Sequence, residues 1–527
     1  MKQLICHSRD CKTSLLQILA TTSAIFGILA NSNAEGTKAS GSIGFPSYRG
    51  DGSGAAPESG LELVRSWSDA HLAWSSEEPA PPMGRGPNQL RDSNGVGGFG
   101  VPVVAGDFVY VGYLLPTGPK TDGCMAGPGQ PMADEVVICM DAKTGKTVWR
   151  TVFAGKGWNY CAVYPSDGQI TPCIADGKVL MQGSTGWAYC LDAHDGKVLW
   201  QKPTGKACLA WDGFKAAVLA GTEKPKRMSY ADLKFAQERL APPPPANPKH
   251  GGSGGGGFNS TPMLFGRVAV FNAAGTVAFD VTSGAVLWQR GAILQGSASV
   301  QKWIHDGKEY LIGAGVCVDP ATGKDLWSFG PVGGAYQGYT AAISGDLWVG
   351  VRNDSNTKPA RGEGKTWVEC LRFSPTGATS VWRLPADSGF CYMSPVIHRG
   401  RLYATMGLPK WNTPEEMEAM TGIKDYAGPS ASGDTCIDMA TGKVLGTTGN
   451  SGNDQGNSPF AMDGRIFTHG SQMFDAQPEP KGIWKPLATL KPRTVNCTFP
   501  TGANGFLYLR AAGSKSLVEC WDLRVRE

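Results

Sequence analysis

One sequence pattern recurs along the chain and limits what the chain can fold into. In each copy an apolar run ends in Asp, a Gly follows the Asp by four positions, and a Trp follows the Gly by four. The four strict copies contain Gly145, Gly196, Gly284 and Gly323, followed by Trp149, Trp200, Trp288 and Trp327. Looser copies end at Trp382 and at Gly446, where glycine replaces Trp. Copies in a fixed register indicate a repeat architecture.

Each copy is typical of a β-hairpin. The Asp carboxylate can bond the backbone two residues on and start a turn, and the Gly can adopt a positive φ. A single hairpin cannot bury its own apolar face, so the copies must stack on one another. The repeated Trp is therefore interpreted as a packing residue between neighbouring units rather than as a platform for a ligand.

Eight units can be counted from the strands that precede the hairpins. They usually open with Ser or Thr followed by Pro, or with a related pair, and they start at Val101, Thr171, Thr261, Ser299, Thr340, Ser394, Ser458 and Phe499. The eighth unit reaches a third strand at 517–524, where the sequence stops, while the segment Leu61–Trp67 has the apolar run and terminal Trp of a fourth strand. The pattern predicts an all-β, eight-bladed β-propeller closed by an N-terminal strand. An open solenoid is the alternative.

The predicted propeller spans residues 61–527 and carries two insertions, at 203–258 and 408–433. The first contains helical spacing at Tyr230–Leu240, and the second contains a capping box that starts at Thr413 and closes at Gly422. We expect both insertions on one face of the ring, as a lid or a partner surface. Residues 35–60 form a predicted N-terminal extended segment.

Residues 1–34 resemble a secretory signal peptide. Lys2, Arg9 and Lys12 precede an apolar run at 14–30, and small residues stand before Ala34, the predicted cleavage position. An uncleaved membrane anchor is the alternative. No Cys follows the apolar run to carry a lipid, and no later stretch is long and apolar enough to span a bilayer. The prediction is a periplasmic or extracellular protein.

Charge gives no reason to expect a nucleic-acid partner. The formal net charge of the chain is +4, and the signal region contributes +2 of it. Proteins that bind nucleic acids usually carry a strongly positive surface, and a net charge this small on a chain of this length does not predict one.

The fourteen cysteines fall into groups. Six occupy the position two before the repeated Asp, or its nearest equivalent, and are predicted to be buried core residues: Cys139, Cys190, Cys317, Cys370, Cys436 and Cys520. Six others are disulfide candidates of unknown pairing: Cys124, Cys161, Cys173, Cys208, Cys391 and Cys497. The chain has no Cys-x-x-Cys, so c-type haem is unsupported.

The repeat spacing resembles the tryptophan-docking repeat of the pyrroloquinoline quinone (PQQ) family of propellers, over nearly all of the chain after the signal. The opening Phe45–Gly52 and the closing Cys520–Arg524 also resemble a secreted bacterial branch of PQQ-like repeat proteins of unassigned function. The resemblance implies the eight-bladed fold. The resemblance does not distinguish an enzyme from a non-catalytic protein, because the repeat is shared by quinoprotein dehydrogenases and by a non-catalytic outer-membrane-assembly propeller.

If the chain resembles the dehydrogenases of this family, the resemblance implies bound PQQ and a Ca²⁺ ion held by Glu and Asn. It also implies an Asp base and a quinone stacked between Trp and a vicinal disulfide. This sequence has no adjacent Cys pair, and the Glu, Asn and Asp set does not map onto it. Asn453 and Asp454, in a polar turn, are the only weak metal-ligand candidates. No HExxH or Gly-x-Ser-x-Gly motif is present either, so no catalytic residue is assigned.

Residues just before each inner strand should converge on the ring axis, where propellers bind ligands. In this chain they are aromatic and amide-rich, which suits a planar or sugar-like ligand or a peptide. The predicted site set is Trp158, Asn159, Tyr160, Asn259, Gln295, Tyr336, Gln337, Tyr392, Asn457 and Asn496.

Loop packing with satisfied amides is the alternative for any single residue of this set. The sequence thus predicts a secreted, non-catalytic binding module for a protein, peptide or glycan partner. A divergent PQQ- and Ca²⁺-dependent alcohol or sugar dehydrogenase is the alternative function, and a propeller hydrolase or lyase with an unrecognised site is a third.

Overall fold

A computed structural model describes most of the chain after residue 43. The described ranges are 44–81, 97–98, 100–119, 130, 132–158, 170–222, 260–273, 275–294, 298–330, 340–353, 366–386, 389–390, 393–428, 433–448, 457–468, 471–478, 482–495 and 498–526. The chain divides into two compact units, residues 1–42 and 43–527, and every described residue belongs to the second.

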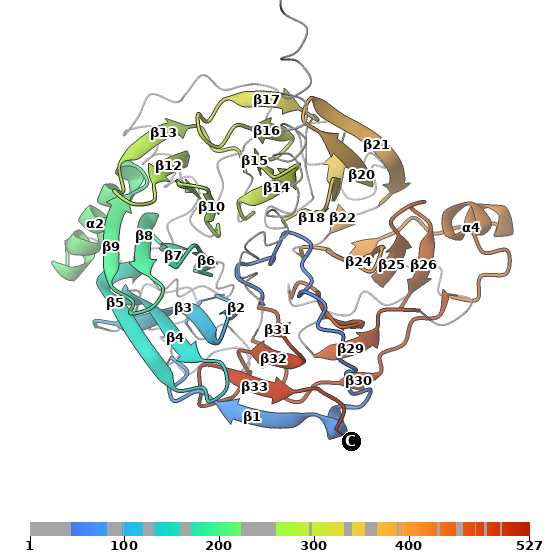
Figure 1. Ribbon diagram of the computed structural model, residues 1–527, viewed down its shortest axis with the longest axis horizontal. Helices are drawn as coiled ribbons and strands as arrows, with labels where there is room; N and C mark the ends of the chain where they lie inside the picture. Colours follow the sequence, from blue (N-terminus) through green and yellow to red (C-terminus); the bar gives the residue numbers. More distant parts are fainter. Residues whose placement is uncertain are drawn as a thin grey trace, which may run out of the picture. The chain divides into compact units, whose positions relative to one another are not determined.

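The described strands form eight antiparallel sheets, which Figure 1 shows as the blades of a ring. The prediction of an eight-bladed β-propeller is confirmed. Blade 1 contains β2 (Val103–Ala105), β3 (Phe108–Thr117), β4 (Met132–Asp141) and β5 (Thr147–Trp158). Blade 2 contains β6 (Cys173–Ala175), β7 (Lys178–Gln182), β8 (Trp187–Asp192) and β9 (Val198–Pro203). Blade 3 contains β10 (Met263–Phe265), β11 (Val268–Asn272), β12 (Thr276–Asp280) and β13 (Val286–Arg290).

Blade 4 contains β14 (Gln301–His305), β15 (Lys308–Ile312), β16 (Val316–Val318) and β17 (Asp325–Ser328). Blade 5 contains β18 (Ala342–Ser344), β19 (Leu347–Asn353), β20 (Thr366–Ser374) and β21 (Gly377–Pro385). Blade 6 contains β22 (Gly389–Phe390), β23 (Val396–His398), β24 (Arg401–Gly407), β25 (Gly433–Asp438) and β26 (Val444–Thr447). Blade 7 contains β27 (Phe460–Met462), β28 (Arg465–Thr468), β29 (Gln472–Asp475) and β30 (Ala488–Thr489).

Blade 8 joins the two ends of the propeller. Its sheet runs in the order β31 (Thr501–Ala503), β32 (Phe506–Leu509), β33 (Glu519–Asp522) and β1 (His71–Ser75). Closure by an N-terminal strand is therefore confirmed, and it removes the exposed edges that an open array of sheets would have.

The prediction that Leu61–Trp67 supplies this closing strand is wrong, because β1 (His71–Ser75) supplies it. Trp74 of β1 lies opposite Cys520, in the same register in which Trp149 lies opposite Cys139. Trp67 instead starts the short 3₁₀ helix η1 (Trp67–Asp69) and packs on Trp521 at a ring-centroid distance of 4.8 Å. Both tryptophans end apolar runs, and only the pairing with β33 distinguishes them.

The repeated turn forms as its spacing predicts. The carboxylate of Asp141 accepts hydrogen bonds from the backbone N–H groups of Lys143 and Thr144, and Gly145 has a φ of +70°. The hydroxyl of Thr144 also donates to this carboxylate at 2.8 Å, and that side-chain hydrogen bond is the largest cause that lowers the pKa of Asp141. The same backbone contacts recur at Asp280 and Asp438, so one local rule builds this turn in several blades.

The repeated Trp locks each blade to the next. The indole N–H of Trp200 donates to the carbonyl of Val281 at 2.8 Å, and its ring covers Gly284 of the neighbouring blade. A Cβ on Gly284 would lie 2.8 Å from the Cγ atom of Trp200. The same contact is made by Trp74, Trp149, Trp288 and Trp382, which donate to the carbonyls of Ala142, Ala193, Pro320 and Met439. The interpretation of the Trp as a packing residue is confirmed.

Trp327 departs from this rule. Its indole nitrogen is buried without a hydrogen-bond partner in the described part of the chain. The following turn, which ends at Gly377, carries an extra residue before its glycine. Trp327 packs instead against Phe373, at a ring-centroid distance of 5.2 Å, and against Phe329 at 5.8 Å.

Two glycine variants separate Trp docking from backbone strain. Gly196 (φ +71°) would place a Cβ 2.4 Å from the ring of Trp149, whereas Gly177 (φ +69°) has no atom within 4 Å of that position. We expect Gly177→Ala to cost about 1–2 kcal/mol of unfolding free energy from the left-handed conformation alone. Gly196→Ala should cost a further ~1–3 kcal/mol from overpacking. Guanidinium denaturation measures both, and equal costs would contradict docking of the Trp on the glycine.

The six repeat-position cysteines are free and buried, which confirms their assignment to the core. Cys173 and Cys208 were disulfide candidates, and that expectation is wrong because both carry free, buried thiols. The thiol of Cys208 donates to the carbonyl of Gly186 at 2.8 Å. Cys124, Cys161, Cys391 and Cys497 lie outside the described residues.

The two insertions leave the blades at the same end. Because the strands alternate in direction, the turns between second and third strands and the connections between blades lie at one end, here called the connection face. Helix α2 (Lys206–Leu219) follows β9, and α4 (Pro414–Thr421) lies between β24 and β25. Figure 1 shows both helices at the outer edge of the ring, where they contact the outermost strands β9 and β26. These helices are therefore not a lid over the axis.

The capping box of α4 is confirmed. The Thr413 hydroxyl accepts the N–H of Glu416 at 3.2 Å, and Gly422 ends the helix in the left-handed conformation. The predicted helical stretch Tyr230–Leu240 lies outside the described residues, whereas α2 was not predicted. Among the described residues, no helix is long and apolar enough to cross a membrane.

Candidate binding site at the ring axis

Residues 44–56, here called the axial segment, pass through the middle of the ring (Figure 1). The inner strands of five blades bind it through their backbone. The donors are the N–H groups of Val104, Ile174, Ile343, Ile397 and Ala461, and the acceptors are the carbonyls of Phe45, Pro46, Gly52, Ser53 and Gly54, at 2.8–3.4 Å. The axial segment is thus an integral part of the propeller.

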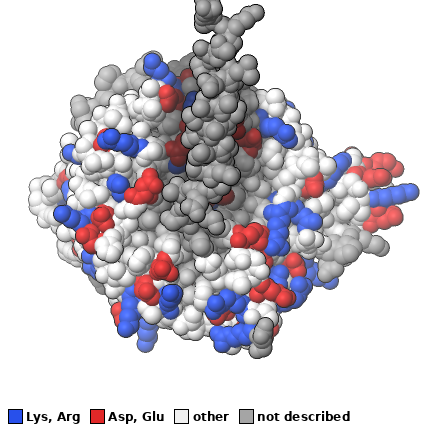
Figure 2. Space-filling model, in the orientation of Figure 1, with Lys and Arg blue, Asp and Glu red and all other residues white. Residues whose placement is uncertain are grey.

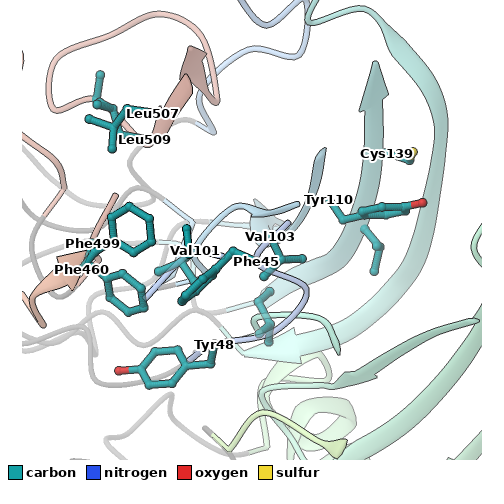
Figure 3. Packing of buried hydrophobic residues seen from close by; sticks show 14 of the residues in the cluster. Phe45, Tyr48, Val101, Val103, Tyr110, Cys139, Phe460, Phe499, Leu507 and Leu509 are labelled. Carbon is teal, nitrogen blue, oxygen red and sulfur yellow. The ribbon is translucent and has the colours of Figure 1, made fainter. Parts of the chain in front are cut away.

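Aromatic packing explains why this segment enters the ring. Phe45 is fully buried and meets Phe460 edge-on, with ring centroids 5.3 Å apart (Figure 3). Tyr48 meets Phe499 in the same way at 5.2 Å. Small residues allow the close approach, since a Cβ on Gly44 would lie only 2.2 Å from the carbonyl oxygen of Val104. Burial of these rings is the apolar driving force for filling the axis.

The axial segment also places a cation inside the ring. The guanidinium of Arg49 is buried, donates to the carbonyls of Pro395 at 2.6 Å and Pro459 at 3.1 Å, and lies 5.2 Å from the centroid of Phe499. A Cβ on Gly54 would lie 2.0 Å from one of its terminal nitrogens, so only glycine fits there. Burial lowers the pKa of Arg49 to about 10, which keeps the side chain charged at neutral pH.

Downstream of the axis, the chain is held over blades 6 and 7. Asp463 accepts the backbone N–H of Ser59 at 2.7 Å and its hydroxyl at 2.7 Å. Arg399 forms a two-fold ion pair with Glu58. Buried Arg465 donates to the carbonyl of Leu63 at 2.7 Å. These contacts guide the chain from the axis to the closing strand β1.

A series of hydroxyl groups links the blades around the axis. The hydroxyl before an inner strand accepts the N–H of the corresponding residue in the preceding blade, at 2.8–3.2 Å. The accepting hydroxyls are Thr171, Ser299, Thr340, Ser394 and Ser458, and the donors are Val101, Thr261, Ser299, Thr340 and Ser394. This bond explains why Ser or Thr opens most units of the sequence.

The predicted site set falls largely outside the described residues. Trp158 is buried at the end of β5 and packs on Phe214 of α2 at 5.4 Å. Asn457 is buried, and its amide donates to the hydroxyl of Thr494 at 2.8 Å. The remaining residues are Asn159, Tyr160, Asn259, Gln295, Tyr336, Gln337, Tyr392 and Asn496, and with the metal candidates Asn453 and Asp454 they lie outside the described part. The set stays a prediction.

A cavity of about 550 Å³ lies at blade 8. It is lined by Ala80, Pro81, Val495, Arg510, Ala511 and residues 513–517. Val495 directly precedes Asn496, and the lining turn between β32 and β33 lies at the connection face. Cavities of roughly 300–1,000 Å³ accommodate small ligands.

A buried carboxylate between blades 1 and 2 was not singled out in the sequence. Glu135 of β4 is fully buried and accepts hydrogen bonds from the Tyr189 hydroxyl at 2.6 Å and from the backbone N–H of Ser184 at 2.6 Å. Burial raises its pKa. A Cβ on Gly183 would lie 2.2 Å from its carboxylate, so the site is sealed and its role is to join the two blades.

The described residues do not fit PQQ and Ca²⁺ on the axis. The axial segment occupies that space, and the described part of the chain contains no group of three His, Cys, Asp or Glu side chains that could hold a metal ion. Figure 2 shows cations and anions interspersed over the visible described surface, without the continuous basic stretch that a nucleic acid requires.

A family model described as outer membrane protein assembly factor BamB (PQQ_2) matches residues 64–224. No curated protein matches the chain. A solved europium-containing methanol dehydrogenase shares 12% identity, covering 88% of this chain and 89% of its own, with a TM-score of 0.48. BamB from Moraxella catarrhalis shares 13% identity over 89% of this chain and 95% of its own, with a TM-score of 0.30.

A quinohemoprotein alcohol dehydrogenase from Comamonas testosteroni shares 15% identity over 92% of this chain and 81% of its own, with a TM-score of 0.37. Likenesses this distant carry no argument about activity. The match to the family model and the eight blades rest on the repeat itself. The resemblance to the PQQ-like propellers is therefore confirmed, since residues 64–224 match the family model and the described strands form the eight-bladed ring.

Proposed function

We propose that this protein is a non-catalytic binding module, exported from the cytoplasm, that binds a peptide, protein or glycan at the connection face of its propeller. The export signal in residues 1–34 and the predicted aromatic and amide set belong to this proposal. One observation carries it, namely that the chain's own axial segment takes the place on the axis where the alternative function requires a cofactor.

Size supports this choice. The cavity beside the axial segment measures about 20 Å³, whereas pockets for ligands the size of a cofactor measure roughly 300–1,000 Å³. Displacing the segment would break five backbone hydrogen bonds to inner strands and expose Phe45 and Tyr48. Among the described residues, a tricyclic quinone with its metal ion would therefore have to displace the axial segment in order to bind between the inner strands, and this supports the non-catalytic alternative.

The connection face supports the binding role. The 550 Å³ cavity at blade 8 combines apolar Ala80, Pro81 and Leu517 with polar Ser514 and Lys515. An apolar lining with a few polar groups is typical of sites that bind part of a larger ligand. Asn457 of the predicted set donates to the carbonyl of Val495, a residue of this lining, so this end of the ring is the proposed contact surface.

Titration with PQQ in the presence of excess Ca²⁺ tests the proposal. We expect no saturable quenching of Trp fluorescence up to high micromolar PQQ, because the axial segment fills the axis. A PQQ-dependent dehydrogenase apoprotein under the same conditions is the positive control. Saturable, Ca²⁺-dependent binding near one PQQ per chain would overturn the proposal and favour the divergent alcohol or sugar dehydrogenase. Binding to a peptide or glycan array that Lys515→Ala weakens would support it.

A further inference from the structure

A second, much smaller cavity lies against the axial segment. It measures about 20 Å³ and is lined by residues 47–52 of the segment and by Thr261, Met263, Thr340 and residues 299–302 of the facing blades. A water-sized molecule needs roughly 10–15 Å³, so the space suits a single water or a monatomic ion.

Two buried hydrogen-bond donors on this lining have no partner. Neither the Nε atom of Arg49 nor the Oγ1 atom of Thr261 has a hydrogen-bond partner in the described part of the chain, and both are shielded from solvent. Thr261 also departs from the hydroxyl series, because five equivalent hydroxyls each accept an N–H from the preceding blade. Orphaned buried donors are costly, and two on one small cavity indicate a shared acceptor.

Charge selects the kind of acceptor. Arg49 is a buried cation whose described partners are neutral carbonyls, and it forms no ion pair among the described residues. Lys302 on the same lining is already paired with Glu309. Asp51 also lines the cavity, but the residue is exposed and its carboxylate accepts the N–H of Ser53 at 2.8 Å. A buried guanidinium without a counter-ion is unfavourable, and an anion in contact with it relieves that cost.

The position of the cavity gives the anion a structural role. The five backbone hydrogen bonds to the axial segment come from blades 1, 2, 5, 6 and 7. The cavity faces the inner strands β10 and β14 of blades 3 and 4, which donate none of these five bonds. An acceptor held between Arg49 and Thr261 would attach the segment on this side of the ring.

We propose that this cavity binds a monatomic halide ion, chloride under physiological conditions, with Arg49 Nε and Thr261 Oγ1 as its donors. The ion ties the axial segment to blade 3 and neutralises the guanidinium inside the ring. The site is distinct from the contact surface at the connection face, so it holds or fails independently of the proposed function.

Bromide serves as the probe because its anomalous scattering identifies it. We expect one anomalous peak between Arg49 and Thr261 in crystals of the purified chain soaked in sodium bromide. In solution, chloride at a hundredfold excess over Kd should raise Tm by roughly 2–3 °C relative to sodium gluconate of equal ionic strength. The absence of the peak together with equal Tm values in both salts means that the cavity holds water, and it overturns the proposal.

Thr261→Val tests the donor with little change in volume, and it should fold because the Thr261 hydroxyl has no hydrogen-bond partner among the described residues. We expect this variant to lose the chloride-dependent rise in Tm. Thr171→Val is the matched control, since Thr171 holds the same position in blade 2, accepts the N–H of Val101 and is absent from the cavity lining. It should lower Tm in both salts and keep the chloride effect. Retention of the chloride effect in Thr261→Val would overturn the assignment.

Discussion

Trp200→Ala is expected to lower the free energy of unfolding by about 3–5 kcal/mol, the cost of deleting a large buried aromatic side chain. The indole is 6% exposed, lies 5.4 Å from the ring of Phe279, and donates to the carbonyl of Val281 in the next blade. Its loss would open a cavity between blades 2 and 3 and leave that carbonyl with only the long contact of 3.8 Å from the Cys190 thiol. Guanidinium denaturation followed by far-UV circular dichroism measures the change.

The neighbouring residue on the same strand is the control. Leu199 is 42% exposed, so Leu199→Ala should change the free energy of unfolding by no more than about 0.5 kcal/mol. The pair shares strand, blade and substitution type, and it differs in which side of the sheet the residue faces. Equal destabilisation by the two variants would contradict the role of the repeated Trp as the contact between blades.

The second large effect is expected at the axis. Arg49→Met keeps an unbranched apolar stem but removes the donors to the carbonyls of Pro395 and Pro459, which stay buried. Each buried acceptor that loses its partner costs about 1–3 kcal/mol, so we expect a total loss of about 2–6 kcal/mol from the two carbonyls. The variant should also be cleaved faster by proteases at the peptide bonds before residue 61, because the axial segment loses its central contact.

Arg65→Met is the control in the same N-terminal region. Arg65 pairs with Asp475 at 2.9 Å, but its side chain is 62% exposed, and an exposed ion pair contributes about 0–1 kcal/mol. A loss at Arg49 no larger than at Arg65, with unchanged proteolysis, would show that the axial segment is held weakly and would remove the main support for the proposed function.

Features with local or periodic causes could be predicted from the sequence. The spacing of Asp, Gly and Trp predicted the hairpins and the packing role of the Trp, because each turn is closed by bonds within a few residues, as at Asp141 and Gly145. The cap of α4 at Thr413 was readable for the same reason. The blade count followed from repetition, since every unit must stack on the next to bury its apolar face.

The candidate site was less accessible to sequence reasoning. The aromatic and amide set was deduced from the expected position before each inner strand, and only Trp158 and Asn457 of that set lie among the described residues. The small cavity could not be foreseen, because Thr261 looks like every other hydroxyl that opens a unit, and only the folded ring shows that its Oγ1 lacks a partner.

What the sequence determined by itself is therefore the repeating unit, the number of units and the need for an N-terminal closing strand. The tertiary structure decided which strand closes the ring and what fills its axis. Trp74 rather than Trp67 closes it because only Trp74 lies opposite Cys520, and the axial segment is held by contacts such as that of Arg49 with Pro459, 410 positions away. Contacts at such separations follow no period in the sequence, and they arise only when the blades have closed into a ring.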